Sequence, residues 1–226
     1  MKIIYCLPII KSRKNEVLDI INENINQYLY FEIWLDYIDD LDDEFIKKLI
    51  KQLEGRIIFL FRRKNLEKIN MSLQKREEII YILEDSNSYL DLDVIEQKEE
   101  IDYIEKSSLK IQTIISYHNY KQTPTNDKLG EITDIIIKHN PKIIKLSTFC
   151  RDKADALSLL NTLLDLKQKN KKYIVSGMGE NGKIVKIFGA LWGNEMTFAP
   201  LDIKEASAPG QIAKSDLEKI LGILNT

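Results

Sequence analysis

The chain has few of the features that mark disulfide-stabilised, zinc-binding or membrane-spanning proteins. Its 226 residues include two cysteines, Cys6 and Cys150, which are too few for a disulfide framework, and no CxxC spacing indicates a metal site. No apolar run approaches the roughly 20 residues that a membrane helix needs. The N-terminal segment has no signal-peptide pattern. We therefore expect a cytoplasmic protein that uses no metal and binds no membrane.

An excess of positive charge is also missing. Lys and Arg number 33 against 35 Asp and Glu, which gives a formal net charge of −2. Proteins that bind nucleic acid or anionic membranes concentrate Lys and Arg on one surface. The short basic clusters at 62–64 and 169–172 have acidic residues close by, which favours solvated faces. Nucleic acid is therefore not an expected partner.

Hydrophobic residues, 44% of the chain, fall in short β-branched runs between longer segments of mixed polarity. Most of these runs are nearly continuous rather than alternating, which is typical of strands buried on both faces of a parallel sheet. The predicted strands are 2–9, 31–37, 56–62, 89–95, 110–117, 142–148, 172–177 and 195–199.

Segments with helical periodicity lie between the strands, as at 123–140, 152–170 and 215–225. Thr125 and Asp152 are possible caps for the first two. The alternation of about eight strands with helices predicts an α/β fold of the (β/α)8 TIM-barrel class, for which about 250 residues is typical. We expect residues 1–226 to form a single domain. An open doubly wound sheet is the alternative, but no glycine-rich turn follows the first strand.

Polar side chains interrupt the predicted strands near their carboxyl ends, where a barrel builds its functional site. These residues are Glu32, Asp36, Arg62, Asp93, His118 and Lys145. Lys145 has apolar neighbours on both sides, and desolvation favours a neutral amine that attacks ketones to form a Schiff base. A lysine that reaches the surface or pairs with a carboxylate is the alternative. His118, on the preceding strand, is a possible proton shuttle or a structural histidine, and His139 fits a helix end.

The segment "KEASAPGQIAK" (204–214) follows the last predicted strand and precedes the last helix. A loop at this place lies over the mouth of a barrel. Gly210 permits special backbone angles, and Ser207 and Gln211 supply neutral hydrogen-bonding groups. A lid over bound ligand and an ordinary helix-entry loop both explain these residues.

Several motifs together resemble type I 3-dehydroquinate dehydratase. "SYHNY", "PKIIKLST", "SGMGENGKIVKIFG" and "TFA" followed by "ASAPGQI" occur in the order and approximate spacing of that family. "EIWLD" and "FLFR" resemble its earlier strands, so the resemblance spans nearly the whole chain. It implies a (β/α)8 barrel without metal or organic cofactor, which often forms a homodimer and takes 3-dehydroquinate as substrate in the shikimate pathway.

The resemblance also implies roles for individual residues. Lys145 would form an imine with the ketone of 3-dehydroquinate, and His118 would move the protons that convert it to 3-dehydroshikimate. Glu32 and Arg62 would contact substrate hydroxyls. The residues implied in binding are Glu32, Arg62, Lys186, Ser207, Gln211, Met178 and Phe198, the last loop (around 199–212) serving as a lid.

Three positions depart from the family pattern. Trp34 and Lys186 stand where arginines are usual, and Leu66 stands four residues after Arg62, where an acid is usual, with Glu67 next to it. Lysine keeps the charge of arginine but lacks its bidentate geometry. We therefore predict weaker binding of dehydroquinate with the imine chemistry intact. A different Schiff-base enzyme such as an aldolase, and a barrel that only binds a shikimate-type ligand or a protein partner, are the alternatives.

Overall fold

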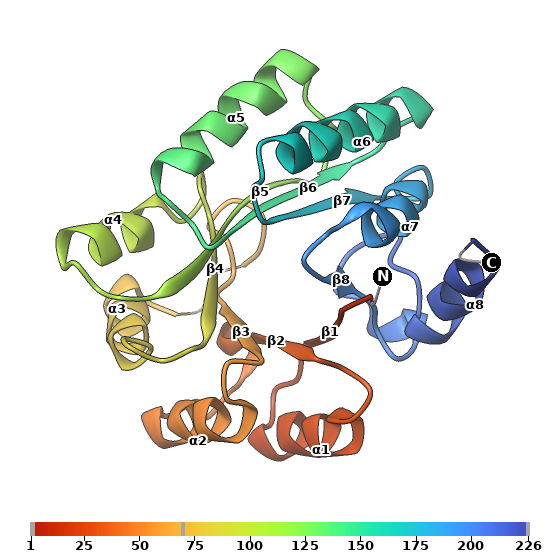
Figure 1. Cartoon of the computed structure of the whole chain (residues 1–226). Helices are drawn as coiled ribbons and strands as arrows, with labels where there is room; N and C mark the ends of the chain where they lie inside the picture. Colours follow the sequence, from red (N-terminus) through yellow and green to blue (C-terminus); the bar gives the residue numbers. More distant parts are fainter. Residues whose placement is uncertain (1–2, 69–70, 225–226) are drawn as a thin grey trace. The chain divides into compact units, whose positions relative to one another are not determined.

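Strands and helices alternate along the chain in the computed structural model, which describes residues 3–68 and 71–224 (Figure 1). Within these residues eight strands form one sheet in the order β7-β6-β5-β4-β3-β2-β1-β8; seven α-helices connect them and an eighth follows the last strand. Neighbouring strands pair in parallel, as in the registers of Glu32 with Ile58 and Lys145 with Ile174. The predicted (β/α)8 TIM-barrel class is confirmed. Positions 2 and 225 of the predicted end elements lie outside the described residues.

The chain packs as two compact units, residues 9–114 and residues 3–8 with 115–224. Strands β1 (Tyr5–Ile9) and β5 (Gln112–Asn119) each cross a unit boundary. The other elements of the first unit are α1 (Lys14–Asn24), β2 (Tyr30–Trp34), η1 (Leu35–Tyr37), α2 (Asp43–Leu53), β3 (Ile57–Leu60), α3 (Leu73–Ile82), β4 (Tyr89–Asp93) and α4 (Lys98–Lys106).

The second unit contains the remaining strands and helices. They are α5 (Asn126–Lys138), β6 (Ile143–Phe149), α6 (Lys153–Gln168), β7 (Tyr173–Met178), α7 (Lys183–Trp192), β8 (Thr197–Phe198), η2 (Ile203–Glu205) and α8 (Lys214–Leu224).

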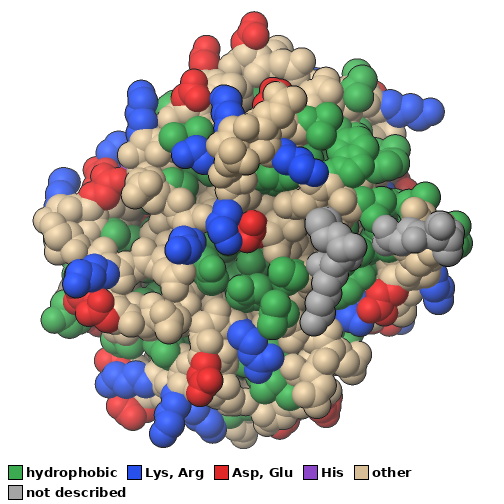
Figure 2. All heavy atoms as spheres, viewed as in Figure 1, with side chains coloured by type: hydrophobic (Ala, Val, Ile, Leu, Met, Phe, Trp, Pro, Cys, Tyr) green, Lys and Arg blue, Asp and Glu red, His purple; other side chains and the backbone are tan. Residues whose placement is uncertain are grey.

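Local sequence explains where two helices of the second unit, α5 and α6, begin. The Thr125 side chain accepts a hydrogen bond from the Lys128 amide, and the Asp152 side chain accepts one from the Asp155 amide, so both predicted caps are confirmed. One face of α6 is buried through Leu159, Leu160, Leu163 and Leu166, whereas Leu157 and Leu164 are exposed. Figure 2 shows positive and negative side chains interspersed on the face that it draws.

The strands differ from their predicted lengths near the candidate site. Strand β2 ends at Trp34, and residues 35–37 turn into a short 3-10 helix instead of extending the strand. Strand β3 ends at Leu60, so Arg62 lies in the loop beyond it. Strand β5 continues to Asn119 and includes His118. The apolar runs determine the central residues of each strand, whereas the residue at which a strand ends depends on contacts with distant parts of the chain.

No helix in the described ranges is long and apolar enough to span a membrane.

Candidate active site

Lys145 lies in the middle of β6, where its neighbours on both sides are buried. Its own side chain is nearly buried, with 6% of the residue exposed. The Nζ atom lies 4.4 Å from the ring centroid of Phe198 on β8, a strand that is not adjacent to β6 in the sheet order. Side chains alternate between the two faces of a strand. Lys145 therefore projects to the face that it shares with Phe198, while Ile144 and Leu146 take the opposite face.

His118 lies near the carboxyl end of β5, the strand next to β6. It is half-buried, and its ring meets that of Tyr120 edge-on with 6.4 Å between centroids. The imidazole and the amine thus come from adjacent parallel strands of one sheet. His139 ends α5 as its C-cap residue, as its position near a helix end predicted.

Lys186, predicted to bind a carboxylate, is buried at 5% exposure on α7. Its Nζ donates a hydrogen bond to the carbonyl oxygen of Gly177 on β7. Burial lowers the pKa of Lys186 from 10.5 to about 8; Cys150 opposes this shift and Lys183 adds to it. At neutral pH this amine is still largely protonated, but it loses its proton much more readily than a lysine in water.

The loop after β8 forms hydrogen bonds within itself and to the loop after β7. The Ser207 amide donates to Gln211 Oε1 at 2.8 Å, and Gln211 Nε2 donates to Ser207 Oγ at 3.0 Å. The Gly179 amide donates to the carbonyl of Pro209 at 3.1 Å. Gly210 has a positive φ of 75°, and a Cβ there would lie 2.3 Å from the Gly179 oxygen. The loop is therefore docked beside Met178, the buried last residue of β7.

Glu32 and Trp34 lie two residues apart on β2 and are both buried. The indole Nε1 of Trp34 donates to Glu32 Oε2 at 3.3 Å. The residue that replaces the family's usual arginine is thus bonded to the predicted substrate-binding carboxylate.

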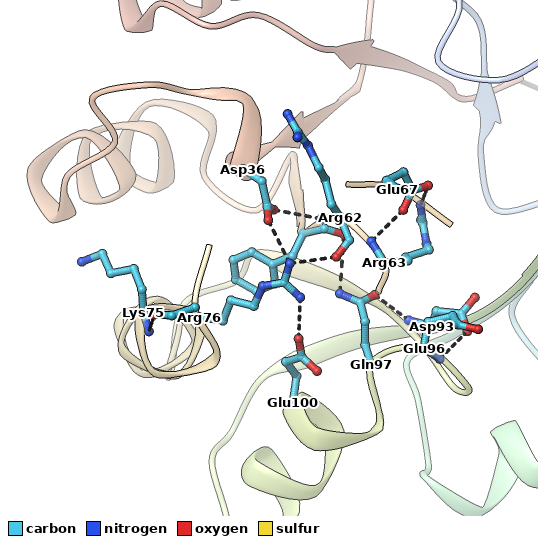
Figure 3. Close-up of polar contacts among 12 residues, drawn as sticks. Asp36, Arg62, Arg63, Glu67, Lys75, Arg76, Asp93, Glu96, Gln97 and Glu100 are labelled. Atoms are coloured by element: carbon cyan, nitrogen blue, oxygen red, sulfur yellow. Dashed lines mark hydrogen bonds and ion pairs between the residues drawn. The ribbon is translucent and has the colours of Figure 1, made fainter. Parts of the chain in front are cut away.

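Arg62 is half-exposed and is engaged by its own surroundings. Its guanidinium lies 3.6 Å from the ring centroid of Tyr37, and its Nη1 donates to the carbonyl of Lys68 at 2.8 Å. Figure 3 shows the Arg62 side chain directed away from the neighbouring Arg63. The structure thus places the predicted arginine against Tyr37.

Arg63 and Glu67 form a buried ion pair that sequence reasoning missed. Arg63 Nη1 lies 3.2 Å from Glu67 Oε1, their side chains are 3% and 13% exposed, and the Arg63 amide donates to Glu67 Oε2 (Figure 3). The Arg63 guanidinium lies 5.5 Å from the ring centroid of Trp34. The sequence contained a signal for this pair. The family pattern places an acid four residues after the arginine, and Glu67 lies four residues after Arg63 rather than after Arg62.

A second buried network holds the segment that carries both arginines (Figure 3). Arg76 on α3 pairs with Asp36 at 2.9 Å and Glu100 at 2.7 Å, and it also donates to the carbonyl of Arg62 at 2.8 Å. Asp36 in turn accepts from the Arg62 amide. Asp93, another polar strand end, accepts from the amides of the turn that follows it. Asp36 and Asp93 therefore have structural contacts.

The part of the chain that the structure describes holds no cluster of three or more His, Cys, Asp and Glu side chains suited to a metal ion. A buried amine on one strand of a parallel barrel and a histidine on the next are typical of barrel enzymes that act on carbonyl compounds.

Comparison with known proteins agrees with this class. The family described as type I 3-dehydroquinase matches residues 5–226. The 3-dehydroquinate dehydratase of Methanococcus vannielii is 31% identical over 230 residues, covering 97% of this chain and 99% of the relative. That of Methanococcus maripaludis strain C6 is 27% identical with the same coverage. The chain therefore belongs to the type I 3-dehydroquinase family.

Solved structures confirm the fold. The 3-dehydroquinate dehydratase of Geobacillus kaustophilus superposes with a TM-score of 0.84 at 22% identity, covering all of this chain and 92% of that one. The type I enzyme of Clostridium difficile, solved with covalently modified comenic acid, gives 0.81 at 19% identity, covering 99% of this chain and 92% of that one.

Proposed function

We propose that this chain converts 3-dehydroquinate to 3-dehydroshikimate through an imine on Lys145. The observation that carries the proposal is the buried Lys145 amine beside Phe198, on the strand next to that of His118. A lysine amine attacks a ketone to form an imine, and the enclosed position of Lys145 beside Phe198 keeps bulk water away from the reacting atoms. Family membership supports the substrate.

The chemistry follows from the imine. The amine adds to the substrate ketone and water leaves, which gives a protonated imine that withdraws electrons from the neighbouring carbon. His118 removes a proton from that carbon, and the electron pair moves toward the imine nitrogen as an enamine. His118 then returns the proton to the departing hydroxyl, which leaves as water, and a second water hydrolyses the product imine. One imidazole serves both steps because its ring nitrogens can both accept and donate a proton.

Binding would involve two parts of the substrate, its hydroxyls and its carboxylate. Glu32 would accept hydrogen bonds from substrate hydroxyls, and we assign the arginine contact to Arg63, because Arg62 is stacked on Tyr37. An arginine held by a carboxylate has a fixed guanidinium, which orients a polar ring at little entropic cost.

The substrate carboxylate would bind Lys186. An ammonium carries three donors, so it can keep the bond to Gly177 and still donate to a carboxylate. Met178 and Phe198 would form apolar walls, and Ser207 and Gln211 would close over the ligand from the last loop.

Borohydride reduction in the presence of 3-dehydroquinate tests the mechanism. We expect a covalent adduct that maps by mass spectrometry to Lys145. The variant Lys145→Met is expected to lose both the adduct and the turnover. Lys142 is an exposed lysine just before the same strand, and Lys142→Met, the matched control, is expected to keep both the adduct and the turnover. Turnover that persists in Lys145→Met would refute the assignment, while ligand binding without any turnover would favour a barrel that only binds the ligand.

The two arginines are tested as a pair. Arg63→Gln is expected to raise the KM for 3-dehydroquinate by about tenfold or more, since it removes a charge-assisted hydrogen bond of about 1.5–3 kcal/mol. Arg62→Gln is expected to change KM by less than about threefold. The reverse order would return the substrate contact to Arg62.

We further propose that the chain is cytoplasmic and that it forms a homodimer, the latter because the family resemblance implies one. The mass of the purified protein by light scattering tests the dimer, and cell fractionation tests the location.

A further inference from the structure

Trp34 lies between two residues that the proposed function assigns to the substrate. It ends β2, is 7% exposed, and donates its indole N–H to Glu32 Oε2. Residues 32 and 34 project from the same face of the strand because side chains alternate. The short range of this contact means that β2 itself fixes the indole relative to the carboxylate.

The other side of the indole faces cationic and aromatic groups. The Arg63 guanidinium is 5.5 Å from its ring centroid, and the Tyr37 ring meets it edge-on at 5.8 Å and 79°. A guanidinium over an indole is attracted by the electrons of the ring. Arg63 is fixed at its other end by Glu67. One indole therefore contacts both the carboxylate and the guanidinium proposed to bind the substrate.

We propose that Trp34 is a positioning residue for substrate binding, which aims the Glu32 carboxylate through its N–H and supports the Arg63 guanidinium with its ring. This inference rests on the proposed function. A carboxylate offers about four acceptor sites, so one bond to an indole fixes its orientation and leaves it able to accept from a hydroxyl.

Trp34→Phe tests the role of the N–H, because phenylalanine keeps an aromatic ring and loses the donor. We expect the KM for 3-dehydroquinate to rise about tenfold, with kcat within about twofold of the wild type. Trp192→Phe is the matched control, since the chain has two tryptophans and Trp192 lies on α7, packed on Phe188. It is expected to leave both constants unchanged. A wild-type KM in Trp34→Phe would overturn the proposal.

A double-mutant cycle separates positioning from general packing. If Trp34 acts through Glu32, the replacement Trp34→Phe is expected to raise KM much less in a Glu32→Ala background than in the wild type. Equal increases in both backgrounds would overturn the assignment to Glu32.

Tryptophan fluorescence provides a readout that needs no turnover. In Lys145→Met with Trp192→Phe, Trp34 is the sole tryptophan, and we expect its emission to change as 3-dehydroquinate saturates the protein. Lys145→Met with Trp34→Phe is expected to show no change. Constant emission from Trp34 at saturation, established by calorimetry, would overturn the inference. If wild-type protein neither binds nor converts 3-dehydroquinate, the proposed function itself fails, which is a distinguishable result.

Discussion

The two compact units differ in the kind of cation that they bury, arginine in one and lysine in the other. In residues 9–114, arginines are buried against carboxylates: Arg76 pairs with Asp36 and Glu100, and Arg63 pairs with Glu67. In the unit of residues 3–8 and 115–224, two lysines are buried: Lys145, whose Nζ lies 4.4 Å from the ring centroid of Phe198, and Lys186, whose Nζ donates a hydrogen bond to the carbonyl oxygen of Gly177.

This difference has a chemical reason. Arginine stays charged at any physiological pH, so a buried guanidinium needs anions, and the pair gives a rigid binding surface. Lysine can give up its proton when it is desolvated, so a buried amine can serve as a nucleophile. Substitutions in the unit with buried lysines and in the unit with buried arginines test this comparison, beginning with the largest expected effect.

His118→Ala is expected to abolish proton transfer in the unit that holds Lys145. Loss of a general acid–base group typically costs 10²–10⁴-fold, so kcat is expected to fall by about that factor. The rate of 3-dehydroshikimate formation measures it. His139→Ala, which removes the other histidine at the end of α5, is the control and is expected to retain activity. Full activity of His118→Ala would assign the proton transfer to another group.

Arg76→Met is expected to destabilise the arginine-containing unit. It leaves the buried carboxylates of Asp36 and Glu100 without their cation, which typically costs about 3–5 kcal/mol of unfolding free energy. Denaturant unfolding measures it. Lys128→Met breaks an exposed ion pair with Glu131 and is expected to leave the unfolding free energy nearly unchanged, because solvent screens exposed pairs. Equal costs for the two variants would contradict the role of burial.

Lys186 gives the lysine-containing unit a pH-dependent stability. Its pKa is about 8 in the folded protein, against the ordinary lysine value of 10.5 in the unfolded chain, so the unfolded chain binds more protons between these values. The contribution of Lys186 to the unfolding free energy therefore rises with pH across this window, by about 3 kcal/mol in total.

Comparison with Lys186→Met in a Cys150→Ala background isolates this effect, because the raised pKa of Tyr5 acts in the opposite direction and is present in both proteins, whereas the raised pKa of Cys150 itself depends on Lys186. We expect the unfolding free energy of the Cys150→Ala protein, minus that of the variant that also carries Lys186→Met, to increase from pH 8 to 10.5 when both are measured by urea unfolding. The exposed Lys171→Met is expected to follow the wild type. A constant difference would show that the pKa of Lys186 is not depressed.

Gly210→Ala is expected to weaken the docked loop. The positive φ disfavours alanine by about 1–2 kcal/mol, and the added Cβ meets the Gly179 carbonyl. We expect the KM for 3-dehydroquinate to rise about tenfold, measured by steady-state kinetics. Gly222→Ala adds a Cβ on α8 with no atom within 4 Å, and an unchanged KM there is the control. An unchanged KM in Gly210→Ala would remove the loop from the site.

Much of the fold could be predicted because it rests on local patterns. All eight predicted strands overlap observed ones in the described ranges, and the caps at Thr125 and Asp152 are where their sequence context indicates. The arginine contacts could not be predicted from strand patterns. Arg62 and Arg63 are adjacent in sequence, and only the turn after β3 decides which one is buried.

The sequence by itself determined the alternation of strands and helices and the presence of Lys145 in an apolar strand, because periodicity and the cost of burying charge can be assessed from neighbouring residues. Only the tertiary structure decided that Trp34 bonds Glu32, that Lys186 reaches the Gly177 carbonyl and that Arg76 joins partners 24 and 40 positions away. These contacts depend on the direction of side chains in packed space, which linear spacing does not record.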